Sequence, residues 1–135
     1  MILFADSAGW MAVYDDRDKY HAAAKRAFES LREQQAAFVV TDYVVAETLT
    51  LMLGRLGHER AVAFGEWLLR SPRVKLVRLD IDLWNEAWRL FKMYDDKDFS
   101  FTDCTSFAAM RRERLRDVFT FDRHFEQAGF RLWPR

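Results

Sequence analysis

The sequence predicts an α/β fold built on a mainly parallel β-sheet. Short, fully apolar runs such as residues 2–5 and 38–41 alternate with longer segments whose apolar residues recur at helical spacing. Strands that are apolar on both faces are typical of parallel sheets covered by helices. The alternation of strand and helix along the chain indicates that helical crossovers connect the strands.

The expected elements follow from these patterns in chain order. Strands are predicted where apolar runs, or the alternating run near residue 76, occur: 2–5, 38–41, 74–79, 118–121 and 130–132. Helices are predicted where apolar residues share one helical face: 8–14, 19–35, 43–53, 58–69, 83–94, 103–115 and 122–127. Asp82 and Thr102 are candidate caps for the helices that follow them. No linker or repeat divides the chain, so residues 1–135 are expected to form one domain.

Composition limits the possible settings of the protein. Half of the residues are apolar and 31% are charged, which is typical of a folded, water-soluble chain. The 21 basic residues balance 21 acidic ones, so any affinity for nucleic acid must come from local clustering. Cys104 is the only cysteine, so no internal disulfide forms and a reducing cytoplasm is expected. No apolar run approaches the roughly 20 residues of a membrane span, so we expect no membrane partner.

Four carboxylates occur where predicted strands meet helices. Asp6 directly follows the first strand, and Asp122 follows the fourth. Asp103 lies in the first turn of a helix, where the helix dipole favours an acid. Glu47 lies in an apolar helical segment with no lysine or arginine three or four positions away. Because ligands bind at the carboxyl ends of parallel strands, these acids are expected to converge at that edge.

Such a cluster survives only by holding protons or by binding cations. At a separation of about 5 Å and an effective dielectric constant of about 20, each pair of carboxylates would repel by about 3 kcal/mol. Oxygen ligands suit Mg²⁺ or Mn²⁺, whereas the spacing of His and Cys expected for zinc is absent. A cation held by carboxylates activates water and neutralises phosphoryl charge, so the pattern predicts hydrolysis of phosphodiester bonds.

Four short motifs carry a resemblance to a known family: residues 4–7 (FADS), 45–47 (VAE), 101–104 (FTDC) and 119–125 (FTFDRHF). In this order and spacing the chain resembles the PIN-domain nucleases, in particular the VapC-like toxins of type II toxin–antitoxin systems. The resemblance implies a three-layer sandwich with a central sheet of about four to five strands flanked by about seven helices. It also implies an endoribonuclease that depends on Mg²⁺ or Mn²⁺, forms a homodimer and is inhibited by a small antitoxin protein.

The resemblance also implies roles for individual residues. The acidic residues would bind metal and carry catalysis: Asp6, Glu47, Asp103 and Asp122. Three hydroxyl side chains would support them by orienting carboxylates or water: Ser7, Thr102 and Thr120. Some family members carry a further acid two residues after the last one, but His124 occupies this position here. The sequence therefore leaves open whether one or two metal ions bind.

A basic run and two aromatic groups have other interpretations. The run consists of Arg111, Arg112, Arg114 and Arg116, and its position favours an interaction with a helix C-terminus. Contact with the RNA backbone, by these arginines or by His124, is the second interpretation. The aromatic residues of helix 83–94 are expected in the core: Trp84, Trp88 and Phe91. The helices within residues 43–70 are the expected partner surface, with Phe64, Trp67 and Leu68 exposed.

Other function classes fit less well. A dehalogenase-type phosphatase requires a second Asp two residues after Asp6, where this chain has Ala8. A receiver domain requires paired acids and a late strand-end lysine, and nucleotide-binding glycine motifs are absent. A non-catalytic RNA-binding module would have little use for four intact acids. A PIN-fold nuclease or RNA-binding module that acts in RNA processing, without a toxin role, is the remaining alternative.

Overall fold

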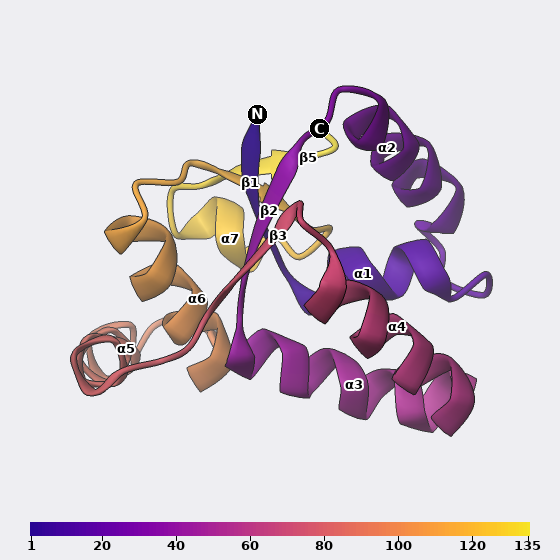
Figure 1. Ribbon diagram of the computed structural model, residues 1–135. Helices are drawn as coiled ribbons and strands as arrows, with labels where there is room; N and C mark the ends of the chain where they lie inside the picture. The colour runs from indigo at the N-terminus through magenta and orange to yellow at the C-terminus, as the bar shows by residue number, and fades with distance from the viewer.

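A sheet of five parallel strands lies at the centre of the protein, as the computed structural model of residues 1–135 shows (Figure 1). The strands are β1 (Ile2–Ala5), β2 (Ala37–Thr41), β3 (Val74–Val77), β4 (Asp117–Phe119) and β5 (Arg131–Trp133). Their spatial order is β3-β2-β1-β4-β5, and every neighbouring pair is parallel. The carboxyl ends of all strands therefore lie at one edge of the sheet.

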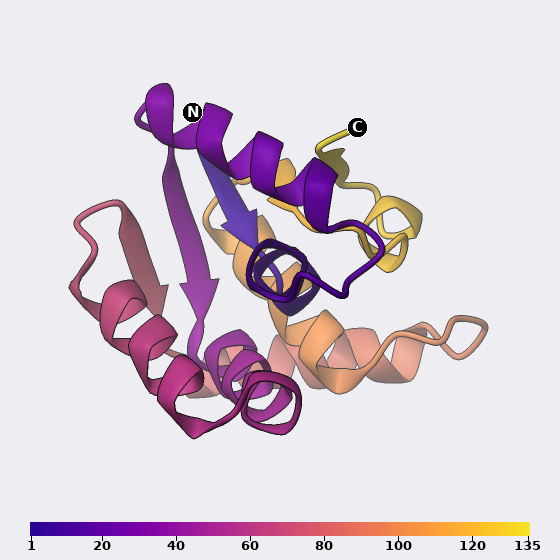
Figure 2. The ribbon, with the colours of Figure 1, turned by 90° about the vertical axis from the view of Figure 1, so that its right-hand side faces the viewer.

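Seven helices surround the sheet: α1 (Ser7–Tyr14), α2 (His21–Glu33), α3 (Asp42–Leu56), α4 (His58–Arg70), α5 (Ile81–Met93), α6 (Phe101–Arg112) and α7 (His124–Gln127). Helices α1, α2 and α4 cover one face, and α5, α6 and α7 cover the other (Figures 1 and 2). Helix α3 begins at the end of β2 and contributes to both cores. None of the helices combines the length and the hydrophobicity that a bilayer crossing requires. The predicted three-layer α/β architecture is confirmed.

The alternating side chains of the strands build two cores. In β1, Leu3 and Ala5 face the α1 side, whereas Phe4 faces the α6 side and packs near Phe125. Trp10 of α1 is fully buried at the centre of the first core, where it contacts several aromatic rings. Because β1 is buried on both faces, the chain that leaves it is held in a fixed position.

The predicted burial of the aromatic residues on α5 is wrong, and so is the predicted exposure of two of the three residues on α4. Trp84, Trp88 and Phe91 are 40%, 43% and 41% exposed, because the neighbouring stripe of α5 (Leu83, Ala87 and Leu90) faces the core. Phe64 and Leu68, expected at the surface, are buried against the first core, and of that group only Trp67 is exposed. The exposed aromatic surface therefore lies on α5.

Two predicted helix caps are also wrong. Asp80, rather than Asp82, accepts the hydrogen bond from the backbone N–H of Leu83, because α5 begins at Ile81. Ser100, rather than Thr102, caps α6, which begins one residue earlier than Thr102.

Candidate active site

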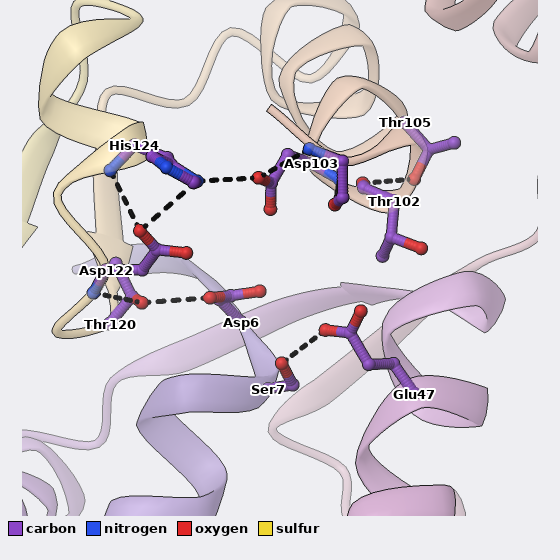
Figure 3. A network of polar contacts seen from close by, with 10 residues as sticks. Asp6, Ser7, Glu47, Thr102, Asp103, Thr105, Thr120, Asp122 and His124 are labelled. Carbon is purple, nitrogen blue, oxygen red and sulfur yellow. Dashed lines mark hydrogen bonds and ion pairs between the residues drawn. The ribbon is translucent and has the colours of Figure 1, made fainter. Parts of the chain in front are cut away.

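Asp6 occupies the junction between the central strand β1 and helix α1. Its side chain is only 3% exposed, and its backbone N–H donates to the carbonyl oxygen of Phe119 at 3.2 Å. The hydroxyl of Thr120, which directly follows β4, donates to Asp6 Oδ2 at 2.9 Å (Figure 3). The pairing of β1 with β4 thus brings Asp6 and Thr120 together from opposite ends of the chain.

Asp103 is fixed by a capping box at the start of α6. Ser100 Oγ accepts from the backbone N–H of Asp103 at 2.9 Å, and Asp103 Oδ2 accepts from the backbone N–H of Ser100 at 3.1 Å. Asp103 is buried, so its carboxylate has few other partners from solvent. The same contacts that begin the helix therefore aim an acid at the sheet edge.

Asp122, between β4 and α7, and His124, the first residue of α7, lie opposite Asp103. The backbone N–H of Asp122 donates to Thr120 Oγ1 at 3.1 Å, and that of His124 donates to Asp122 Oδ1 at 2.9 Å. The Nδ1 atom of His124 lies 3.0 Å from Asp103 Oδ2 and 3.5 Å from Asp122 Oδ1. His124 thus bridges two of the predicted acids, as Figure 3 shows.

Glu47 joins the group from helix α3. Ser7, in the first turn of α1, donates its hydroxyl hydrogen bond to Glu47 Oε1, which ties α1 to α3 (Figure 3). Glu47 and Thr102 line a hollow of about 550 Å³ at this edge. Thr102 itself makes no side-chain hydrogen bond to any of the four acids; its carbonyl oxygen accepts from Thr105.

The electrostatics of Asp6 show that the four acids act on one another. The pKa of Asp6 is raised to about 7, mainly by burial; the Thr120 hydroxyl lowers it, and the negative charges of Asp103, Glu47 and Asp122 add to the rise. Burial likewise raises the pKa of Asp103, opposed by its hydrogen bonds from Ser100 and His124. The structure therefore concentrates negative charge where water is largely excluded.

This donor set fits a divalent cation. None of the four acids forms an ion pair with a lysine or arginine, and only His124 approaches them as a potential cation. One ligand atom each from Asp103, Asp122 and His124 lie within 4.8 Å of one another. Carboxylate oxygens suit Mg²⁺ or Mn²⁺, and an imidazole nitrogen is better suited to Mn²⁺ than to Mg²⁺. The repulsion that raises the pKa of Asp6 is what a bound cation would relieve.

The basic run predicted as a possible RNA contact lies elsewhere. Arg111 and Arg112 close the C-terminal end of α6, whereas Asp103 lies at its beginning. Arg112 pairs with Asp80 at 2.7 Å, and Arg116 directly precedes β4, at the opposite edge of the sheet from the acids. The structure does not bring this run to the site, although it brings His124 there.

Sequence reasoning missed the role of Ser100. A signal was available, because a serine followed three residues later by an acid is the signature of a capping box. The sequence also did not show which hydroxyl group contacts which carboxylate. Ser7 serves Glu47, whereas Thr120 serves Asp6.

Known proteins are similar to this chain over most of its length. The chain is 34% identical to the 23S rRNA-specific endonuclease VapC20 of Mycobacterium tuberculosis over 129 residues, which cover 96% of this chain and 95% of that protein. It is 28% identical over 130 residues to Ribonuclease VapC26 of the same organism, covering 91% of this chain and 89% of that protein.

Solved structures and a family model extend the comparison. The crystal structure of Mycobacterium tuberculosis VapC20, described as a Sarcin-Ricin loop cleaving toxin, superposes with a TM-score of 0.88 at 34% identity and covers 97% of both chains. VapBC2 from Rickettsia felis, bound to a promoter DNA fragment, gives a TM-score of 0.71 at 12% identity over 98% of this chain and 99% of that one, which supports the fold alone. The family model for the PIN domain matches residues 3–131. The chain therefore belongs to the PIN-domain family.

Proposed function

We propose that the protein is a metal-dependent endoribonuclease and the toxin of a toxin–antitoxin pair. The observation that carries this proposal is the group of acids at one sheet edge without a lysine or arginine partner, in which Asp103, Asp122 and His124 offer ligand atoms within 4.8 Å of one another. The similarity to VapC20, whose name describes a 23S rRNA-specific endonuclease, supports RNA as the substrate. The description of the same relative as a toxin supports a small antitoxin protein as a partner.

In this proposal the acids hold Mg²⁺ or Mn²⁺: Asp6, Glu47, Asp103 and Asp122, with His124 beside them. When bound, the ion would supply Lewis-acid neutralisation of phosphoryl charge and a lowered pKa for a nearby water. The hydroxyls of Thr120 and Ser7 orient Asp6 and Glu47, and the Ser100 cap orients Asp103. In-line attack by water would leave a 5′-phosphate and a 3′-hydroxyl.

The test compares the parent protein with Asp6→Asn and Asp103→Asn, and Asp95→Asn in an exposed loop is the matched control. We expect the parent and the control to arrest growth and cleave RNA, and both site variants to lose these activities by at least about 100-fold. Cleavage by both site variants at the parental rate would refute the proposed mechanism. A separate measurement is the melting temperature, which Mg²⁺ or Mn²⁺ at millimolar concentration should raise in the parent.

We further propose that the exposed aromatic face of α5 binds a second copy of the chain. Trp84, Trp88 and Phe91 stack along this face and contact Phe101, which lies two residues before Asp103. A two-fold dimer through this face would cover these rings and bring the two sites close together. Trp88→Glu should give a monomer in size-exclusion chromatography with light scattering, whereas Trp67→Glu on α4 should not. A dimer that survives Trp88→Glu would exclude this face.

The remaining parts of the proposal concern the cellular location, the neighbouring gene and the extent of the domain. A cytoplasmic location fits a chain whose single cysteine is buried and free. A neighbouring gene for a short antitoxin would favour the toxin role over a nuclease of RNA processing, and residues 1–135 would act as one domain.

A further inference from the structure

A groove of about 1160 Å³ runs between α2 and β5, beside the acids rather than over them. Figures 1 and 2 both place α2 next to the C-terminal end of the chain. Thr120, whose hydroxyl donates to Asp6, is one of the residues that line the groove. The volume of the groove is slightly above the roughly 300–1,000 Å³ of a typical small-molecule pocket, so it is large enough for a nucleotide. The groove therefore adjoins the candidate active site but is separated from it by the buried Thr120.

The groove is basic although the chain as a whole is neutral. Its lining contains four arginines and a single acid: Arg26, Arg123, Arg131, Arg135 and Glu126. Arg123 pairs with Glu126 at 2.7 Å, and Arg131 pairs with Asp117 at 3.0 Å. The exposed side chain of Arg26 forms no ion pair and no hydrogen bond, so its charge is available to an anion.

An aromatic platform lies at one end of the groove. Tyr20 stacks on Phe121 with ring centroids 4.6 Å apart and an angle of 8° between the planes. Tyr20 is 40% exposed, and the Nζ atom of Lys19 lies 5.0 Å from the centre of its ring. An exposed ring next to cations is the combination on which bases of single-stranded nucleic acid stack.

One short segment separates the groove from the acids. Phe121 and Arg123 line the groove, whereas the intervening Asp122 contacts His124 at the acidic site. We propose that a single-stranded part of the RNA substrate lies in this groove, with a base on Tyr20 and a phosphate on Arg26. The inference rests on the proposed function, because the groove would guide the strand to the acids.

The charges and the rings favour RNA over a peptide. An acidic peptide would satisfy the arginines, but it would gain little from a flat, exposed tyrosine next to them. A nucleic acid strand uses both features at once, since phosphates alternate with bases. The groove adjoins the acids only across the short segment that follows β4, because Thr120 itself is fully buried.

The test measures binding of a short fluorescein-labelled single-stranded RNA by anisotropy, in EDTA so that no cleavage occurs. Tyr20→Ala should weaken binding about fivefold or more, whereas Tyr20→Phe should restore it. Arg26→Gln should reduce the slope of log K against log salt by about 0.7, the value for one phosphate contact. Lys25→Gln, an exposed neighbour on α2 outside the groove, is the matched control. Circular dichroism checks that all variants fold.

The outcomes separate the two proposals. If the parent cleaves RNA and both groove variants bind it with parental affinity and salt slope, the groove proposal is overturned and the proposed function stands. If Asp6→Asn leaves cleavage intact while Arg26→Gln and Tyr20→Ala weaken binding, the proposed function fails and the groove remains an RNA site. If Tyr20→Ala and Arg26→Gln keep the parental RNA affinity but lose binding of an acidic antitoxin peptide, the groove binds a protein partner. That result also overturns the proposal.

Discussion

Replacing Asp6 with asparagine should stabilise the metal-free protein above neutral pH. Asp6 is buried, and its carboxyl group is surrounded by the charges of Asp103, Glu47 and Asp122. Asparagine has nearly the same shape, and its carbonyl oxygen can still accept the hydrogen bond from Thr120. The substitution therefore removes the charge and leaves the packing in place.

The size of the effect follows from the pKa of Asp6. Burial and like charges raise this pKa from its ordinary value of 3.8 to about 7 in the folded protein. The difference is about 3 pH units at about 1.4 kcal/mol each, so ionising Asp6 in the fold costs about 4 kcal/mol. Below pH 4 the Asp6 carboxyl group is protonated in both the folded and the unfolded protein, so it does not lower the stability. Between pH 4 and 7 the folded state holds the extra proton, so stability falls as pH rises and the full cost applies above pH 7.

The assay is urea unfolding in EDTA at pH 4, 6 and 8, followed by circular dichroism. We expect Asp6→Asn to match the parent at pH 4 and to exceed it by about 1–4 kcal/mol at pH 8. At about 4 °C per kcal/mol, the melting temperature should show the same difference. Adding Mg²⁺ or Mn²⁺ should stabilise the parent more than the variant. Equal pH dependence for the two proteins would show that Asp6 titrates normally and that the acids do not form a desolvated cluster.

Three further predictions concern the scaffold of the site. Gly9→Ala should destabilise the protein by about 2 kcal/mol or more in urea unfolding, because a Cβ there would clash with the carbonyl oxygen of Phe119; near-parental stability would contradict this close packing. Ser7→Ala should weaken Mn²⁺ binding about tenfold in calorimetry, because Glu47 loses its orienting hydroxyl; an unchanged Kd would remove Ser7 from the site. Ser100→Ala should cost about 1 kcal/mol of stability, and no loss would mean that the capping box contributes nothing.

The sheet, and the edge at which Asp6 and Asp122 lie, could be predicted because both depend on short-range patterns. Strands such as β1 and β2 are apolar on both faces, which only a covered parallel sheet can bury. A parallel sheet has one carboxyl edge, so Asp6 and Asp122 share it, but they come close because β1 pairs with β4, which the sequence did not show. The negative charge of Glu47 contributes to the raised pKa of Asp6.

The surface of α5 could not be predicted, because two adjacent stripes of this helix are both apolar. Leu83 and Ala87 on one stripe face the core, whereas Trp84 and Trp88 on the other face solvent. The larger rings bury more apolar area, so the sequence alone favours them for the core. The smaller stripe is buried because α5 packs closely on α6, whose buried residues include Ala108 and Ala109.

The contacts that hold the acids explain how a neutral protein can maintain so negative a site. The groups that bind Asp6 and Glu47 are the hydroxyls of Thr120 and Ser7, and Asp103 receives a backbone N–H and a histidine nitrogen. A hydroxyl or an amide orients a carboxylate without cancelling its charge, whereas a lysine or an arginine would do both. The cost of the uncompensated charge appears in the raised pKa of Asp6. The buried negative charge therefore lowers the stability of the metal-free fold, and a cation bound to these acids would restore it. The same charge also gives the site its affinity for metal.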